Sequence, residues 1–254
     1  MSNSPLISYT RLSPNHSGRR NHVIDTISIH CMAGNASVET CGALFADPAR
    51  KASSNYGIGS DGRIALYVDE ANRSWCTSNA ANDHRAITIE VANNGGAPDW
   101  PVSDKAYSAL LDLLTDICRR NNIKELLWKG NKSLIGQVGK QNMTVHRWFA
   151  AKACPGDYLY NRHGEIAAEV NRRLKGEEEP MDIAKLISEM TNKQAYQLMQ
   201  KAELHAKTIQ EPSWSKEEGH WAKATANGIV DGTSPERPMK RDEVIAVLGR
   251  KGLL

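Results

Sequence analysis

The sequence lacks any uninterrupted apolar run of the roughly 20 residues that a membrane-spanning helix needs, so we expect no transmembrane segment. It also lacks, between Met1 and Asn21, the basic segment and apolar stretch that make up a secretory signal. We therefore expect the chain to be made in the cytoplasm and to stay there unless another protein exports it.

Net charge of one sign is equally scarce. The 32 Lys and Arg residues are balanced by 29 Asp and Glu residues, which leaves a formal charge of +3. So weak an overall field gives no reason to expect nucleic acid as a partner.

The five cysteines are an odd number without a secretory signal, which argues against a disulfide framework, so most should be free thiols. Cys118 lies in a helical apolar pattern and should fill the core.

What the sequence does have is enough chain, 254 residues with 40% hydrophobic residues, for one good core and a second small module. We expect strands at residues 23–30, 53–58, 63–68, 86–91 and 143–146. The first strand alternates apolar with polar residues, which predicts one buried face, and it ends at His30. The Asp61-Gly62 pair predicts a hairpin turn between the second and third strands.

Helices are expected at residues 37–46, 103–121 and 164–174, with Ser37 and Ser103 as N-caps of the first two. Strands interleaved with helices predict an α/β domain, a mixed central sheet flanked by helices, over residues 1–175. The charged run 176–180, closed by Pro180, is the expected linker. Residues 181–254 should form a small α-helical region, beginning with one or two helices over 181–207.

Three residues stand out as metal ligands, namely His30, His146 and Cys154, the first two at expected strand ends. Two imidazoles and one thiolate suit Zn²⁺, and three protein ligands leave a fourth position open, as catalytic sites do. His146 and Cys154 are too far apart in sequence to share one helical face. A loop must therefore fold Cys154 back beside His146, and Pro155 and Gly156 make such a loop credible.

Four segments in this order carry a resemblance to a known family: residues 26–30 (TISIH), 86–91 (AITIEV), 144–148 (TVHRW) and 152–156 (KACPG). Over about residues 21–174 the chain resembles the zinc-binding N-acetylmuramoyl-L-alanine amidases of the amidase-2 type, relatives of peptidoglycan recognition proteins. The resemblance implies that His30, His146 and Cys154 hold the zinc. It also implies catalytic roles for Lys152, two residues before the last ligand, and for Glu90, the acid/base in several bacterial members.

The chemistry of amide hydrolysis fits these residues. Bound zinc lowers the pKa of water to about 7, Glu90 would move the proton, and the Lys152 ammonium would stabilise the carbonyl oxygen. The chain departs from the family at two positions. Ser54, not Tyr56, falls where some members carry a tyrosine, so Tyr56 should lie in the cleft or the core. Cys76 follows Trp75 where members often have a histidine.

Residues 214–250 resemble a single S-layer-homology-type repeat, with Gly228 ending a first helix and Pro238 near the start of a second. Such repeats normally come in threes, so one copy would not complete a wall-polymer site alone. One interpretation is cell-wall targeting, with residues 181–207 joining copies into a homo-oligomer and raising avidity. The other interpretation is a small helical cap without a ligand.

The leading hypothesis is an endolysin of phage type that cuts the bond between N-acetylmuramic acid and L-alanine. The resemblance implies that it acts on the peptidoglycan of a Gram-positive wall after release through a holin. An alternative is a recognition protein that binds peptidoglycan without cutting it; such family members lack the last zinc ligand, so Cys154 favours the enzyme. A structural wall protein would need a secretion signal.

Overall fold

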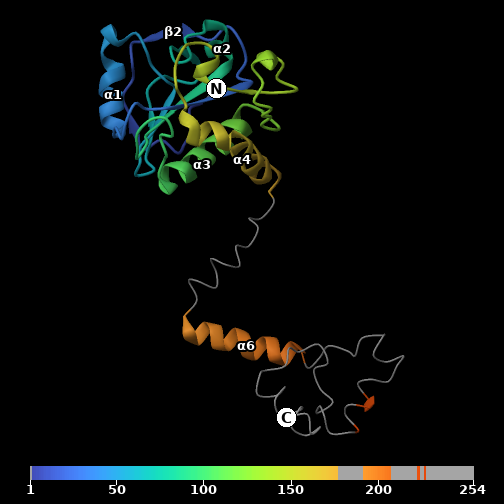
Figure 1. Ribbon diagram of the computed structural model, residues 1–254. Coiled ribbons are helices and arrows are strands. Elements are labelled where there is room, and N and C mark those ends of the chain that lie inside the picture. The colour runs from blue at the N-terminus through green and yellow to red at the C-terminus, as the bar shows by residue number, and fades with distance from the viewer. Residues whose placement is uncertain (1, 177–190, 207–221, 224–225, 227–254) are drawn as a thin grey trace. The chain divides into compact units, whose positions relative to one another are not determined.

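The computed structural model in Figure 1 describes residues 2–176, 191–206, 222–223 and 226. The chain divides into two compact units, Met1–Glu179 and Pro180–Leu254. The division falls within residues 176–180, which were expected to be the linker. Among the described residues, no helix is long and apolar enough to cross a bilayer.

A six-stranded mixed sheet forms the centre of the first unit, in the order β1-β5-β4-β7-β3-β8. Its strands are β1 (Tyr9–Thr10), β3 (Thr26–Cys31), β4 (Tyr56–Ile58), β5 (Ile64–Leu66), β7 (Ala86–Val91) and β8 (Met143–Thr144). Only the β4–β5 pair is antiparallel. A separate antiparallel pair joins β2 (His16–Arg19) to β6 (Asn72–Ser74). The expected hairpin is confirmed, since Gly59 N donates to Arg63 O across the turn between β4 and β5.

Helices flank the sheet, which confirms the α/β class. They are α1 (Val38–Ala46), α2 (Ala80–Arg85), α3 (Asp104–Arg120) and α4 (Gly156–Lys175), with short 3-10 turns η1 (Pro48–Arg50), η2 (Lys132–Leu134) and η3 (His146–Trp148). The two expected N-caps are confirmed: Ser37 accepts from Thr40 N and Ser103 accepts from Ala106 N. Figure 1 shows α3 and α4 side by side, with α1 away from them.

The main core lies between the sheet and the α3–α4 pair. On neighbouring strands, Ile27 pairs with Ile87 and Ile29 pairs with Ile89, and all four side chains are fully buried. They pack in one cluster with α3 residues such as Leu110. A second, smaller cluster of buried hydrophobic residues includes Val38 and Phe45 of α1. Cys118 is fully buried, so its expected place in the core is confirmed.

The expectation that the first strand buries only one face is wrong, because all six residues of β3 are buried. The polar side chains Ser28 and His30 alternate with the core isoleucines, so they lie on the other face of the sheet. Both side chains are fully buried, and they are hydrogen-bonded to each other. The polar half of the strand pattern therefore marks a second buried face of the strand.

Helix α4 begins at Gly156, eight residues before the expected Gly164. Its first turns are polar in sequence, yet Leu159 and His163 are fully buried, so packing stabilises the extra turns. The expected strand 143–146 is shorter than predicted and ends at Thr144, because His146 starts the 3-10 turn η3.

In the second unit, helix α6 (Asn192–Ala206) lies within the predicted helical segment 181–207. Its N-terminus is capped by Thr191, whose Oγ1 accepts from Gln194 N. Apart from residues 222–223 and 226, the segment 214–250 that resembles an S-layer-homology repeat lies outside the described residues.

Candidate active site

The site is built on the two central strands, where His30 of β3 and Glu90 of β7 are direct partners in a parallel register. Ser28 and Thr88 pair in the same way two residues earlier, so all four side chains lie on the face opposite the isoleucine core. Alternation along two strands thus places the expected metal ligand and the expected acid/base side by side.

His30, His146 and Cys154 come together as a group that can hold a metal ion, with ligand atoms all within 4.8 Å of one another. Nδ1 of His30 lies 3.3 Å from Sγ of Cys154. The two imidazole rings have their centres 5.2 Å apart. The structure therefore brings together, from three separate segments, the three residues that the sequence analysis selected.

Each of the two imidazoles is hydrogen-bonded to a serine hydroxyl. Oγ of Ser28 lies 3.0 Å from Nε2 of His30, and Oγ of Ser78 lies 3.1 Å from Nε2 of His146. Each of these hydrogen bonds occupies Nε2 of the ring and leaves Nδ1 as the nitrogen that can bind a metal ion. Neither serine was predicted from the sequence as part of the site. Ser28 carried a usable signal, because it lies two residues before His30 on the same strand face.

A loop carries Cys154 back to His146, as expected. Its ends meet where Arg147 N donates to Cys154 O over 3.1 Å. The Arg147 guanidinium also donates to Ala153 O at 2.6 Å and to Asp157. Gly156 has φ +82°, and a Cβ there would lie 2.7 Å from Asp99 O, so this close turn requires glycine.

Burial and hydrogen bonding set the protonation of the two more accessible candidate ligands, His146 and Cys154. Burial lowers the pKa of His146 to about 4, with further contributions from His30 and Lys152, so the imidazole is in the neutral form that binds metals. The hydrogen bond with Cys31 raises the pKa of the Cys154 thiol, and burial raises it further. A metal ion that bound at Cys154 would therefore release a proton.

Glu90 has the environment of a carboxyl that exchanges protons. Burial raises its pKa to about 8, against the opposing effects of Arg50 and Cys76. Its Oε1 lies 3.9 Å from Sγ of Cys76, and its Oε2 is buried without a hydrogen-bond partner among the described residues. Such a carboxyl is poised to take up or give a proton near neutral pH.

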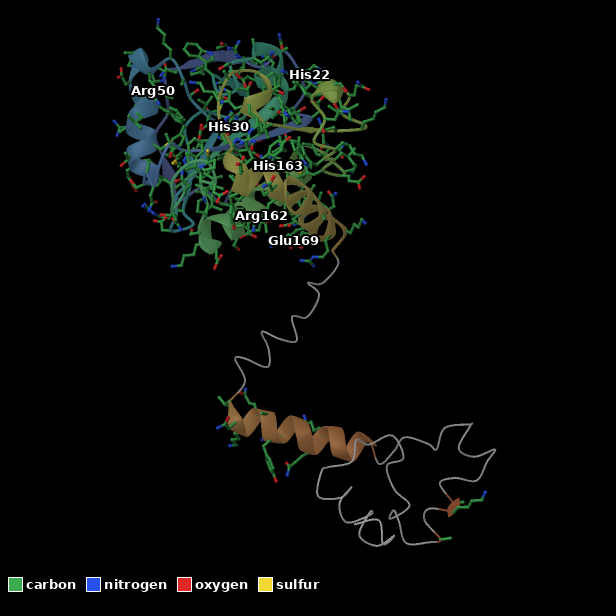
Figure 2. The ribbon with its side chains drawn as sticks, in the orientation of Figure 1. His22, His30, Arg50, Arg162, His163 and Glu169 are labelled. Carbon is green, nitrogen blue, oxygen red and sulfur yellow. The ribbon has the colours of Figure 1, made fainter. Side chains whose placement is uncertain are left out.

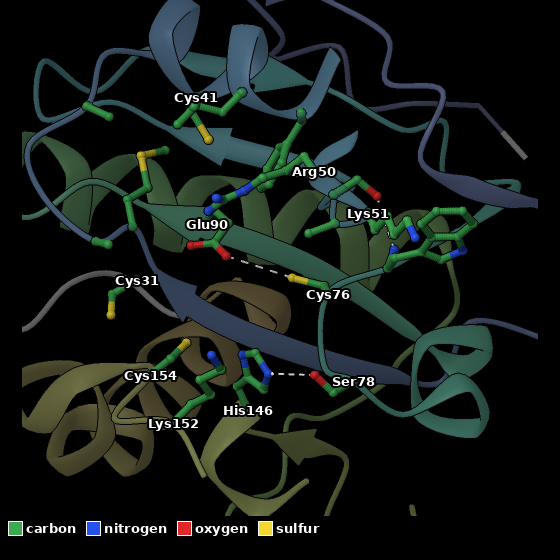
Figure 3. Close-up of a pocket in the computed structure, with 18 of the residues that line it drawn as sticks. Cys31, Cys41, Arg50, Lys51, Cys76, Ser78, Glu90, His146, Lys152 and Cys154 are labelled. Carbon is green, nitrogen blue, oxygen red and sulfur yellow. Dashed lines mark hydrogen bonds between the residues drawn. The ribbon is translucent and has the colours of Figure 1, made fainter. Parts of the chain in front are cut away.

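One cleft of about 1040 Å³ is lined by Glu90, His146, Lys152 and Cys154. His146, Lys152 and Cys154 line one part of it and Glu90 lies between them and Arg50, as Figure 3 shows. In the view of Figure 2, Arg50 lies on the α1 side of the unit and His163 on the α4 side. The cleft walls also carry two tryptophans, Trp75 and Trp100.

Other conspicuous residues do not belong to the cleft. Tyr56 is fully buried, with its hydroxyl donating to Glu70, so it is a core residue, and Ser54 is buried with its hydroxyl on Tyr56 O. Trp128 is stacked on Trp148 with ring centres 5.1 Å apart, and it also contacts the ring of His163. These two tryptophans pack against each other, and neither is among the residues that line the cleft.

Residues 20–157 match the family model described as N-acetylmuramoyl-L-alanine amidase. No curated protein has a significantly similar sequence. The fold is similar to that of the Staphylococcus aureus hydrolase AmiA, solved in complex with its ligand, with 16% identity, a TM-score of 0.53 and coverage of 71% of this chain and 90% of that one.

Two further solved structures match over most of their own length. The endolysin amidase LysCS of Clostridium intestinale has 16% identity and a TM-score of 0.49, and the match covers 67% of this chain and 99% of that one. The Drosophila peptidoglycan recognition protein SA has 18% identity and a TM-score of 0.44, covering 61% of this chain and 90% of that one.

Proposed function

Because this chain belongs to the N-acetylmuramoyl-L-alanine amidase family, we propose that it hydrolyses the amide bond between N-acetylmuramic acid and L-alanine in bacterial peptidoglycan, using Zn²⁺. The observation that carries the proposal is the meeting of His30, His146 and Cys154 beside the buried carboxyl of Glu90. Metal-dependent amide hydrolysis requires a metal site and, beside it, a group that can exchange a proton near neutral pH.

The donor set fits zinc. Two imidazoles and one thiol suit Zn²⁺ better than the oxygen-seeking cations Mg²⁺ and Ca²⁺. The serines behind the rings support this fit, since a ring nitrogen held by a hydrogen bond fixes the orientation of the nitrogen that binds the metal. His30, His146 and Cys154 would hold the ion, and three protein ligands are the number that catalytic zinc sites use.

Bound zinc supplies a Lewis acid that lowers the pKa of water to about 7 and polarises a carbonyl oxygen. Glu90 takes the proton from the attacking water through its unpartnered Oε2 and passes it to the leaving nitrogen of L-alanine. Its raised pKa suits both halves of this transfer, because a carboxyl that titrates near neutrality is neither too weak a base nor too weak an acid.

Lys152 is placed to act on the charge that develops at the scissile carbonyl. It lines the cleft together with His146 and Cys154, and it is close enough to His146 to lower the pKa of that imidazole. An ammonium there would stabilise a developing oxyanion. Trp75 and Trp100 offer apolar surface to the substrate on other parts of the wall.

The biological setting is part of the proposal. We propose an endolysin of phage type that is made in the host cytoplasm and reaches a Gram-positive cell wall after release through a holin. Residues 181–254 would add contacts with a wall polymer or join chains into a homo-oligomer. The rival function is a recognition protein that binds peptidoglycan without cutting it. The presence of Cys154 beside both histidines favours hydrolysis.

Two measurements together test the proposal. Elemental analysis of protein purified without added zinc should find close to one zinc per chain. Purified cell walls incubated with this protein should gain new L-alanine amino termini, and chelation followed by zinc should abolish and then restore the gain. Tight binding to walls without new amino termini in the zinc-loaded protein would establish the recognition protein instead.

A further inference from the structure

Cys76 places a second thiol beside the candidate active site. It follows strand β6, and its backbone N donates to Oδ2 of Asp83 over 3.2 Å. The backbone N of Thr77 donates to the same carboxylate, so Asp83 fixes this turn of the chain. Figure 3 shows the Cys76 side chain extending toward Glu90. The thiol donates to Oε1 of Glu90, with Sγ and the oxygen 3.9 Å apart.

His30, Cys76 and Glu90 form a second group that can hold a metal ion, with ligand atoms all within 4.8 Å of one another. In the described part of the chain it is one of two such groups, and the two share His30. A tetrahedral zinc ion lies about 2.3 Å from a thiolate sulfur and about 2.1 Å from a carboxylate oxygen, which separates these two atoms by roughly 3.6 Å. The observed 3.9 Å between Sγ of Cys76 and Oε1 of Glu90 is close to this separation.

The carboxylate of Glu90 has donor capacity that the described residues leave unused. Its Oε2 is buried without a hydrogen-bond partner among them, and its Oε1 accepts a long bond from a thiol, which is a weak donor. When the thiol loses its proton, a thiolate faces a carboxylate in a buried position, and a cation between the two anions removes their repulsion. Cys76 and Glu90 therefore have the charge, the donor atoms and the spacing of a cation site.

The two groups differ in the protein donors that remain for an ion. The first ion takes Nδ1 of His30 together with His146 and Cys154, and Nε2 of His30 is already hydrogen-bonded. A second ion therefore has Cys76 and Glu90 as its protein ligands, and solvent completes its coordination. Burial raises the pKa of the Cys76 thiol, so the second ion must also displace a proton. Both features make the second ion the weaker one, bound only when zinc exceeds one per chain.

We infer that Cys76 and Glu90 bind a second thiol-binding divalent cation, Zn²⁺ or Cd²⁺, and that this ion inhibits the enzyme. The site depends only on the contacts described above, whereas the inhibition rests on the proposed amidase function. A carboxylate that is coordinated to a metal ion no longer accepts a proton from the attacking water. The reaction then lacks its base, so turnover falls while the first ion stays bound.

Equilibrium dialysis of the full chain carrying one zinc tests the site directly. Cadmium is the probe, because it is a soft cation that prefers thiolate ligands and its bond to sulfur absorbs in the ultraviolet. The wild-type protein should keep its zinc and bind one cadmium, with the thiolate absorption rising in proportion to the cadmium bound. Cys76→Ala and Glu90→Gln should each bind this cadmium at least about tenfold more weakly, since one of two protein ligands is lost.

Cys41→Ala is the matched control. Cys41 is a buried thiol of α1 that lines the same cleft but belongs to neither of the two metal groups. Its loss should leave the cadmium affinity unchanged. Retention of the first zinc and an unchanged near-ultraviolet circular dichroism spectrum check that Cys76→Ala folds. Cys76→Ser, in which the hydroxyl is a poor ligand of similar shape, is a second variant with the same expected result.

The inhibition is measured as kcat on a soluble muropeptide at buffered concentrations of free zinc. Wild-type activity should fall as the second ion binds, with half inhibition at the zinc concentration that half fills the second site. Cys76→Ala should need at least about tenfold more zinc for the same inhibition. Cys41→Ala should follow the wild-type curve.

Two results would overturn the site. They are cadmium that binds only by displacing the first zinc, and a second cadmium that binds equally well to the wild-type protein and to Cys76→Ala. Equal zinc inhibition of these two proteins would overturn the inhibition. All three results leave the amidase proposal intact. A second cadmium bound through Cys76 in a zinc-loaded protein that hydrolyses no muropeptide would instead refute the amidase function and the inhibition, and it would leave the cation site standing.

Discussion

His30 and Glu90 are paired residues on adjacent parallel strands, so the proposed metal ligand and the proposed proton carrier lie side by side on the same face of the sheet. Both side chains come from the interior of regular strands and not from loops. Residues on rigid elements hold catalytic geometry more closely than loop residues do. The loop ligand Cys154 is instead held in place by the backbone bond to Arg147 N.

Removing any ligand should remove the metal and the activity together. His30→Ala, His146→Ala and Cys154→Ser each leave two protein donors, and a three-ligand site has no spare donor. We expect less than one zinc per chain by elemental analysis and no detectable release of L-alanine amino termini. Cys118→Ser, at a fully buried core cysteine outside the cleft, is the control for cysteine loss and should retain zinc. Full zinc content and activity in Cys154→Ser would remove this residue from the site.

Glu90→Gln should separate proton transfer from metal binding. The amide is close in size to the carboxyl but cannot accept the proton, and loss of a general base costs about 10²- to 10⁴-fold in rate. We expect an unchanged zinc content and a fall in kcat of that size on a soluble muropeptide. Turnover at the parental rate would show that another group moves the proton.

Lys152→Ala should slow catalysis by about 10²- to 10³-fold, because a donor at the developing oxyanion is lost. Zinc content should be unchanged, since Lys152 is not among the grouped ligands. Lys124→Ala serves as the control, because this exposed lysine is not among the cleft residues. Equal kcat values for the two variants would exclude a catalytic role for Lys152.

Ser28→Ala should weaken zinc binding without removing a ligand. The substitution deletes the hydroxyl that lies 3.0 Å from Nε2 of His30, and loss of such an orienting group costs about 10- to 100-fold in metal affinity. Competition with a chromogenic chelator measures the zinc dissociation constant directly. Ser8→Ala, at the sheet edge, should leave that constant unchanged. An unchanged zinc affinity in Ser28→Ala would show that the hydroxyl does not orient the ring.

A protein that ends at Lys175 should fold, bind zinc and cleave soluble muropeptide nearly as fast as the full chain. Every proposed ligand and catalytic group precedes this residue, and the first compact unit ends at Glu179. Its lysis of intact cells should be slower because the wall contacts of residues 181–254 are lost. Light scattering should find the shorter protein monomeric and the full chain larger. Equal lysis by the two proteins and a monomeric full chain would contradict both proposed roles of the C-terminal region.

The sequence by itself determined the features that depend on near neighbours along the chain. Ser37 and Ser103 cap helices through bonds to a backbone three residues ahead, and Asp61-Gly62 turns a hairpin, so short patterns were sufficient to predict them. The motifs around His30, His146 and Cys154 likewise identified the residues of the metal group before any geometry was known.

Only the tertiary structure decided what surrounds those residues. The polar positions of β3 were expected to face solvent, but they are buried, because burial depends on segments distant in sequence. Ser78 reaches His146 across 68 positions of sequence, and no local pattern encodes such a contact. Local hydrogen bonds and periodicity depend on residues a few positions apart. A binding site depends instead on packing between segments that are distant in the sequence.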